Sequence, residues 1–318
     1  MTLNARVKQV YDRALESRAL IFFPSTTTEH MEDGMTFEIR VCPALSDKPK
    51  GSAFSEEKET DHSTEGTQTT KKPNPFLPYD PSLWVDHIGP KHNLLLNKFS
   101  LTPGHLLLTT REFVPQEEGP NRSDIFAALA TLDALAPIPY MTFFNGGPLS
   151  GASQPHKHLQ LFPLPRSAPF APPVLTGMPP NPVGLGGISS PYYDQGPFLP
   201  FLHVFAWLPR TKSQEKRASW IMEVYLHARD HLGLDQEARP SYNVLFTHEW
   251  VMVVKRAREC TDQGISINSL GFAGYMVAKS REEALSITET GVLEILSQVG
   301  EACRPSGFRK GVGGILLK

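Results

Sequence analysis

Cysteine is scarce in this chain of 318 residues, which contains only Cys42, Cys260 and Cys303, far apart in the sequence. No Cys-x-x-Cys pair is present, which argues against the common structural zinc sites. So few thiols are typical of a protein in a reducing compartment, where each cysteine is a small buried side chain. We therefore expect a cytoplasmic protein, with a nuclear presence left open.

Long apolar runs and an excess of one charge are absent too. No run approaches the roughly 20 apolar residues that span a bilayer, and residues 1–7 lack the apolar core of a secretion signal. Lys and Arg number 31 against 33 Asp and Glu, so the formal net charge of -2 offers no general basic field to a nucleic acid. We expect neither a membrane nor a nucleic acid as a partner.

Two common nucleotide-binding motifs are missing as well. The chain contains neither Gly-x-Gly-x-x-Gly nor Gly-x-x-x-x-Gly-Lys-Ser/Thr, so a nucleotide would have to bind in another way. What is present is the composition of an ordinary globular protein, with 40% apolar and 20% charged residues. A chain of this length can bury a substantial core, as one large domain or two modest ones.

Hydrophobic periodicity predicts helices alternating with strands. A helix capped by Asn121 or Ser123 is expected through Leu135, where Pro137 ends it. The other predicted helices cover 3–18, 215–231 and a last segment from Leu285 to Val299, and the predicted strands cover 35–41, 92–99, 105–110, 140–145, 156–162, 201–207, 242–247, 250–255 and 271–279. Strands in hairpins with helices between them indicate an α+β fold, with a mostly antiparallel sheet and flanking helices.

Composition divides the chain into two halves and a connector. Residues 1–165 form an N-terminal half, in which 46–72 is rich in Lys, Glu, Ser and Thr and is predicted to be a mobile surface loop. Residues 166–200 form a connector that is too rich in proline for the interior of a sheet. Residues 201–318 are expected to form a C-terminal half that completes the same compact fold.

The most informative segment is the run 155–160, Pro-His-Lys-His-Leu-Gln, which follows a turn rich in Gly and Ser. In an extended strand, side chains two residues apart share a face. His156, His158 and Gln160 are therefore expected to point one way, and Lys157 the other.

Two imidazoles and an amide beside free backbone N–H groups suit the chemistry of phosphate. A neutral imidazole whose N–H is held by a backbone carbonyl can attack phosphorus with its other nitrogen. Aligned N–H donors would stabilise charge on the phosphoryl oxygens, and Ser150 and Ser153 would add hydroxyl donors. A zinc-binding pair and a purely structural role stay open as alternatives for the two histidines.

The histidine motif and the turn before it resemble the transferase branch of the histidine-triad superfamily, in particular the diadenosine tetraphosphate (Ap4A) phosphorylases, also called ATP adenylyltransferases. Four further stretches, 74–79, 94–99, 242–245 and 268–274, are similar to that family. Uridine-directed relatives usually have proline between the two histidines, and Lys157 at this position favours the adenylyl branch. The resemblance implies a histidine-triad (HIT-like) fold.

The resemblance also implies a role for each residue of the motif. His158 would be the nucleophile that takes up AMP, and His156 would orient the phosphate or support the loop. Gln160 would hold a phosphoryl oxygen, because an amide cannot usefully move a proton. The implied substrate-binding residues are Asn97, Lys98, Asn145, Gly151, Ala152 and Ser153. Lys255 and Arg256 are expected either to face the distal phosphates or to lie on the solvated surface.

An enzyme of this kind would cleave Ap4A with inorganic phosphate into ATP and ADP, reversibly, through a covalent AMP–histidine intermediate. Its partners would be these small molecules alone, with the oligomeric state left open. No tightly bound cofactor and no protein metal site are expected, and a divalent cation such as Mg²⁺ would accompany the nucleotide. Two other functions stay open: a histidine-triad hydrolase of dinucleoside polyphosphates, and a non-catalytic nucleotide-binding module.

Overall fold

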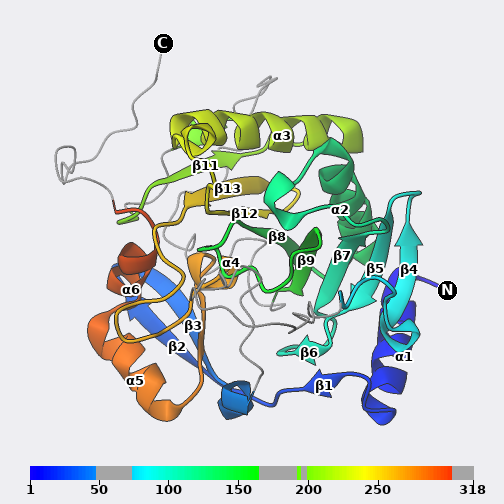
Figure 1. Ribbon diagram of the computed structural model, residues 1–318, viewed down its shortest axis with the longest axis horizontal. Coiled ribbons are helices and arrows are strands. Elements are labelled where there is room, and N and C mark those ends of the chain that lie inside the picture. Colours follow the sequence, from blue (N-terminus) through cyan, green and yellow to red (C-terminus); the bar gives the residue numbers. More distant parts are fainter. Residues whose placement is uncertain (48–73, 165–191, 195–198, 303–318) are drawn as a thin grey trace, which may run out of the picture.

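The computed structural model describes residues 1–47, 74–164, 192–194 and 199–302 (Figure 1). The mobile loop expected at 46–72 lies outside the described residues except for its first two. The connector at 166–200 also lies outside them except for 192–194 and 199–200. In the described part of the chain, no helix has both the length and the apolar character needed to cross a membrane.

A nine-stranded sheet built from both halves of the chain forms the centre of the fold (Figure 1). Every neighbouring pair in it is antiparallel. In spatial order the strands are β10 (Tyr192–Asp194), β11 (His203–Trp207), β13 (Trp250–Lys255), β12 (Tyr242–Phe246), β8 (Tyr140–Gly146), β9 (His158–Pro163), β7 (Leu106–Thr110), β5 (His92–Leu96) and β4 (Trp84–Ile88). The two halves meet where β8 pairs with β12, one strand away from the histidine motif on β9.

Both faces of this sheet are buried, because side chains that alternate along its strands enter two separate apolar cores. On β8, for example, Phe144 belongs to the first core and Phe143 to the second. The helices that pack on the first core are α1 (Leu3–Glu16), α2 (Arg122–Leu135) and α3 (Gln214–His231).

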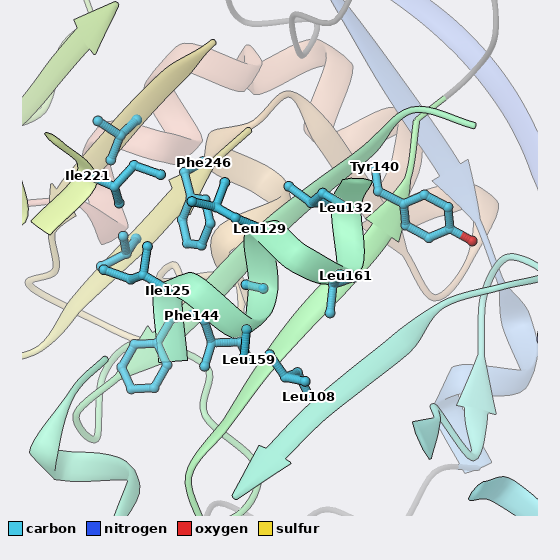
Figure 2. Close-up of a cluster of buried hydrophobic side chains, with 14 of the residues drawn as sticks. Leu108, Ile125, Leu129, Leu132, Tyr140, Phe144, Leu159, Leu161, Ile221 and Phe246 are labelled. Carbon is cyan, nitrogen blue, oxygen red and sulfur yellow. The ribbon is translucent and has the colours of Figure 1, made fainter. Parts of the chain in front are cut away.

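Helix α2 packs directly over the strand that carries the motif. Figure 2 shows Leu129 and Leu132 of α2 close to Leu159 and Leu161 of β9. These four leucines are buried, with Leu159 and Leu161 at 1% and 0% exposure. Since Leu159 lies between His158 and Gln160 in sequence, this packing fixes the strand from which both polar side chains project.

The second core is covered by a smaller sheet and three short helices. The sheet runs β14 (Tyr275–Ala278), β3 (Met35–Val41) and β2 (Thr26–Glu32), and the helices are α4 (Ser269–Phe272), α5 (Arg281–Thr290) and α6 (Val292–Val299). Burial alternates along the whole of β3, as its sequence predicts. A pair of two-residue strands, β1 (Ile21–Phe22) and β6 (Phe99–Ser100), completes the described sheets.

The α+β class and most predicted elements are confirmed. Asn121 is the N-cap of α2: its side-chain oxygen accepts hydrogen bonds from the N–H groups of Ser123 and Asp124, and Asp124 accepts from the N–H of Asn121. The predicted strands 92–99 and 105–110 form an antiparallel pair, β5 with β7, and those at 242–247 and 250–255 form another, β12 with β13, as the interpretation of hairpins requires.

Several predicted elements differ from the structure in their extent, and two of them lie near the end of the described chain. The strand expected at 271–279 is confirmed only over β14, because Asn268 caps a helical turn at α4 and Gly274 then turns the chain at φ +95. The last helix is two helices, because Gly291 adopts φ +91 between α5 and α6. The carboxylate of Glu32 on β2 accepts hydrogen bonds from the N–H groups of Val292 and Leu293, so the second helix has a cap that its own sequence does not supply.

The expected burial of the cysteines holds at one position and fails at another. Cys42 is buried, whereas Cys260 is exposed, and Cys303 lies outside the described residues. Cys260 follows the sheet in a surface segment that pairs only through an isolated bridge with Ser266. Because Cys260 is exposed, it is not one of the small buried side chains that we expected the cysteines to be.

Candidate active site

The strand that carries the histidine motif begins two residues later in the chain than the sequence predicts. Strand β9 begins at His158, and His156 lies before it in an isolated bridge, so the predicted strand start at His156 is wrong. The ladder between β8 and β9 reaches the pair Phe143–Gln160 and stops there. Two residues further along, the same register would pair Asn145 with His158, and at this place the two strands are held together in another way.

The side chain of Gln116 bridges Asn145 and His158. Its Oε1 accepts a hydrogen bond from the backbone N–H of His158 at 2.8 Å, and its Nε2 donates to the carbonyl oxygens of Asn145 at 2.9 Å and His158 at 3.3 Å. Gln116 is itself 1% exposed, in a single helical turn, η3 (Gln116–Glu118). Its amide therefore takes the place of ladder hydrogen bonds where the strands separate beside the motif.

Replacing Gln116 with alanine should lower the free energy of unfolding by about 2–4 kcal/mol, because it leaves buried N–H and C=O groups of Asn145 and His158 without partners. Urea unfolding measures this change. The neighbouring Glu117→Ala, which removes only an exposed ion pair with Arg239, should change stability by less than about 1 kcal/mol. Equal effects of the two substitutions would show that the Gln116 bridge does not stabilise the site.

Hydrogen bonding determines which nitrogen of His158 carries the proton. Nδ1 lies 2.9 Å from the backbone carbonyl oxygen of His156. A carbonyl oxygen can only accept, so Nδ1 carries the hydrogen and Nε2 carries the lone pair. Within the described residues, Nε2 has no hydrogen-bond partner, and it is the nitrogen available to attack an electrophile.

Burial keeps the His158 imidazole neutral. The side chain is 3% exposed, and loss of solvent lowers its pKa to about 4, against the raising effect of the hydrogen bond to His156. The ring of Phe76 contacts it at 5.2 Å between ring centroids. A neutral ring with one free nitrogen is the state that nucleophilic attack requires.

His156 differs from His158 because both of its nitrogens are engaged. Nε2 donates to Thr110, at 3.0 Å from the backbone oxygen and 2.9 Å from Oγ1. Nδ1 then accepts from the Nδ2 of Asn74 at 2.9 Å. Burial lowers the pKa of His156, so this imidazole too is neutral at pH 7. With both nitrogens bonded, His156 can hold the backbone that bonds His158 but cannot act as a nucleophile itself.

A chain of hydrogen bonds from Asn97 through His105 determines the orientation of the Gln160 amide. The Oδ1 of Asn97 accepts from the N–H of Phe99 at 3.1 Å, so its Nδ2 faces the Nδ1 of His105 at 3.3 Å. His105 must then carry its hydrogen on Nε2, which donates to the Oε1 of Gln160 at 2.9 Å. The amide NH2 of Gln160 is left, without a partner in the described part of the chain, as a donor for a ligand.

The structure does not bring Lys98 into this cluster. Its side chain is exposed, and no contact joins it to the other predicted residues within the described ranges. Its backbone oxygen instead accepts from the N–H of Ile21, where β6 pairs with β1. Of the two neighbouring residues predicted to contact substrate, Asn97 is thus connected to Gln160, while Lys98 stands apart.

The loop after β8 presents unpaired backbone donors. The N–H groups of Gly151, Ala152 and Ser153 meet no acceptor among the residues described, although Ala152 is only 4% exposed. Ser153 is exposed, whereas the hydroxyl of Ser150 donates to the carbonyl oxygen of Gly147 at 2.7 Å. The Ser150 hydroxyl, predicted to be a phosphate donor, is thus engaged within the loop, and the three amides are the donors that the loop leaves free in the described structure.

Asn145 supports the loop from within. Its Oδ1 accepts from the Nδ2 of Asn243 at 2.9 Å and from the hydroxyl of Ser269 at 2.6 Å, and its Nδ2 lies 3.5 Å from the oxygen of Gly151. Asn145 is 2% exposed. The structure thus places this predicted substrate-binding residue beneath the loop, with its amide bonded to protein.

Two loop glycines are required by the packing of the C-terminal half. Gly147 and Gly151 have φ of +80 and +82, and a Cβ at these positions would lie 2.1 Å from the oxygen of Pro240 and 2.8 Å from the Cβ of Asn268. In the structure, these glycines allow close approach of the two halves of the chain.

Lys157 points away from the motif face, as the strand pattern predicts. It is 2% exposed, and its Nζ lies 3.5 Å from Asp124 of α2 and 3.8 Å from Glu118. Asp124 also accepts from Nε2 of His92 at 2.7 Å. Burial alone would raise the pKa of Asp124, but the hydrogen bonds from His92 and Asn121 and the charge of Lys157 lower it. Lys157 therefore ties the motif segment to α2.

Sequence reasoning missed three residues that organise this site. Gln116 lies 42 positions from His158, His105 lies 55 positions from Gln160, and Asn74 lies 82 positions from His156. His105 and Asn74 both fell within segments that the sequence singled out, a predicted strand and a family-like stretch. No sequence pattern pointed to Gln116, because its role depends on the place where hydrogen bonding between β8 and β9 stops.

Comparisons with known proteins match most of the chain. The family model for the Ap4A phosphorylase N-terminal domain matches residues 1–176, and that for the ATP adenylyltransferase C-terminal domain matches residues 197–302. Protein APA1 of Saccharomyces cerevisiae is 28% identical over 316 residues, 92% of each chain. Diadenosine 5',5'''-P1,P4-tetraphosphate phosphorylase 2 of the same yeast is 30% identical over 291 residues, covering 84% of this chain and 81% of the relative.

Solved structures agree with these matches. The crystal structure of yeast Ap4A phosphorylase Apa2 in complex with AMP has a TM-score of 0.75 at 26% identity, over 96% of this chain and 99% of that one. The structure of Apa2 in complex with Ap4A has a TM-score of 0.75 at 25% identity, over 95% of this chain and 99% of that one. The expected HIT-like α+β fold is therefore confirmed along nearly the whole length.

Proposed function

This chain belongs to the Ap4A phosphorylase, or ATP adenylyltransferase, family, and we propose that it cleaves Ap4A with inorganic phosphate into ATP and ADP. The matched yeast enzymes, one of them solved with Ap4A bound, support this reaction. The observation in this molecule that carries it is the neutral His158 with a free Nε2 beside unpaired loop amides. The protein is thus a nucleotidyltransferase that acts by two successive displacements.

In the first displacement, the Nε2 of His158 attacks an α-phosphorus of Ap4A. The N–P bond forms, the bond from that phosphorus to the bridging oxygen breaks, and ATP leaves with the electron pair. Negative charge on the nonbridging oxygens is met by the Gln160 amide and by the N–H groups of Gly151, Ala152 and Ser153. The Nδ1–H bond to the carbonyl of His156 stabilises the positive charge that develops on the ring.

In the second displacement, an oxygen of inorganic phosphate attacks the same phosphorus from the vacated side. The N–P bond breaks, ADP forms, and His158 returns to its neutral state. Gln160 favours this acceptor over water, because its amide can hold a phosphoryl oxygen but cannot take a proton from an attacking water. The reverse sequence makes Ap4A from ADP and ATP.

Incubating the protein with Ap4A and radiolabelled phosphate tests this function. We expect the label in the β-phosphate of ADP and none in ATP, and without phosphate we expect cleavage to stop after about one ATP is released per protein molecule. Continued turnover without phosphate would indicate the hydrolase instead. Binding of Ap4A without cleavage under either condition would indicate a nucleotide-binding module.

The pH dependence of the first displacement should follow the low pKa of His158. The ring must be neutral to attack, and its pKa of about 4 means that it stays neutral down to pH 5.5, where an ordinary histidine would be roughly 90% protonated. Rapid-quench measurement of protein-bound AMP should therefore give a constant rate from pH 8 to 5.5. A tenfold fall over this range, in protein that stays folded by circular dichroism, would contradict the neutral His158.

We also propose that a divalent cation such as Mg²⁺ enters with the nucleotide, since substrate phosphates are among its usual ligands. No group of three or more His, Cys, Asp or Glu side chains that could hold a metal occurs in the described ranges. The cytoplasmic compartment stays a prediction from the sequence.

A further inference from the structure

Arg256, directly after β13, is a charged side chain in the interior of the C-terminal half. It is 3% exposed, and the ring of Phe272 lies 5.0 Å from its guanidinium carbon. Its hydrogen bonds all go to neutral oxygens: Asn243 Oδ1 at 2.8 Å, and the backbone oxygens of Ser150 at 3.3 Å, Val299 at 3.2 Å, Arg258 at 2.6 Å and Glu259 at 3.4 Å. Neither of the two sequence expectations, contact with distal phosphates or a solvated surface, describes this position.

No carboxylate forms an ion pair with Arg256 in the part of the chain that the structure describes. The adjacent Lys255, by contrast, is paired with Glu237 at 2.8 Å and Glu301 at 3.2 Å. A buried charge without a paired carboxylate is costly, and burial lowers the pKa of Arg256 to about 9 although the charge of Glu259 acts in the opposite direction. An anion nearby would offset that cost, and the polyphosphate of the dinucleotide substrate is such an anion.

The contact with Ser150 connects Arg256 to the phosphate loop. The carbonyl oxygen of Ser150 accepts from Arg256 at 3.3 Å and from the Nδ2 of Asn243 at 3.0 Å. The 150–151 peptide bond is trans, so the N–H of Gly151 points opposite to that carbonyl, away from Arg256. This N–H is one of the three loop donors that lack an acceptor among the described residues.

Two physical effects follow for the Gly151 N–H. Two donors on the Ser150 oxygen, one of them charged, polarise the peptide and make its N–H a stronger donor. They also prevent the peptide from turning over, which would aim a carbonyl oxygen at the place where a phosphate is expected. The positive charge of Arg256 thus acts on the loop by polarising a single peptide unit.

We propose that Arg256 is a positioning residue for the α-phosphate, acting through the Ser150–Gly151 peptide. The inference rests on the proposed function, because it takes the loop as the phosphate site. In this inference both halves of the chain act on the α-phosphate. The histidine motif of the N-terminal half attacks it, and Arg256 of the C-terminal half helps to bind it. The inference further predicts that the effect of Arg256 depends on the charge of the ligand and not on its nucleoside.

The test compares the binding of AMP with that of adenosine by calorimetry in Arg256→Gln and Arg256→Lys. In Arg256→Gln, we expect the Kd for AMP to rise by about 10- to 100-fold, the range for loss of a charged hydrogen bond, and the Kd for adenosine to stay within twofold. Arg256→Lys keeps the charge and should recover at least half of that loss on a logarithmic scale. The control Arg258→Gln removes the same charge from an exposed residue paired with Asp262, and both ligands should bind as in the wild type.

Equal weakening of AMP and adenosine in Arg256→Gln would overturn the inference, since it would mean that Arg256 only supports the fold. Unchanged binding of both ligands would overturn it as well. If Arg256→Gln does not fold, Arg256→Lys decides: weakening of AMP by more than tenfold despite the retained charge would contradict a charge-dependent role. The proposed function is judged separately, because it fails if wild-type protein does not cleave Ap4A, whatever the binding data are.

Discussion

Replacing His158 with glycine should lower kcat for Ap4A cleavage by roughly four to six orders of magnitude, as loss of a covalent nucleophile does elsewhere. The other imidazole of the motif is no substitute for it. His156 has both nitrogens bonded, to Asn74 and to Thr110. No adenylated protein should form in this variant, because the attacking Nε2 has been removed.

A matched control uses a histidine that is exposed and outside the site. His87 lies on the edge strand β4, where its side chain hydrogen-bonds Asn93 and its ring contacts Trp84. His87→Gly should keep kcat within about threefold of the wild type. A steady-state assay that detects ATP and ADP measures kcat for both variants. Turnover within tenfold of the wild type in His158→Gly would show that the attacking group is elsewhere.

The second large effect is expected at Gln160. Gln160→Ala should slow the formation of protein-bound AMP by about 10²–10³-fold, the range for removal of one donor aimed at a developing oxyanion. The reason is the relay from Asn97 through His105, which turns the Oε1 of Gln160 inward and leaves its NH2 for the phosphoryl oxygen. Single-turnover rapid quench measures this step separately from product release.

Gln160→Glu keeps the shape of the side chain and removes the donor. Its carboxylate would still accept from His105 but would repel a phosphoryl oxygen, so the loss should be at least as large as in Gln160→Ala. Asn97→Ala leaves Gln160 intact and only loosens the relay, and its effect should be clearly smaller, by about tenfold or less. A single-turnover rate unchanged in both Gln160 variants would refute the role of the amide.

Patterns that depend on near neighbours in sequence were sufficient for most of the fold. The alternation in 35–41 predicted β3, and Asn121, one of two candidate caps, predicted the start of α2, because both signals act within one element. Elements that depend on distant partners were not predictable in this way. The break at Gly291 has a cap supplied by Glu32, 260 residues away from Val292 in the sequence.

The same distinction holds in the site. The spacing of His158 and Gln160 was enough to predict that they share a face, because both lie within β9. It could not reveal that the ladder opens beside His158 for Gln116, or that Asn145 lies beneath the loop. These features depend on how β8 and β9 meet the C-terminal half through Asn243 and Ser269. A pattern along one strand carries no information on such contacts.

The intermediate itself gives the most direct test of the account. Protein mixed with Ap4A in phosphate-free buffer and quenched in alkali should carry one AMP, and peptide mass spectrometry should place it on His158. The phosphoramidate should vanish when inorganic phosphate is added before the quench, with release of ADP. AMP attached to another residue, or turnover with no protein-bound AMP at the earliest times that rapid quench can sample, would contradict covalent adenylyl transfer through His158.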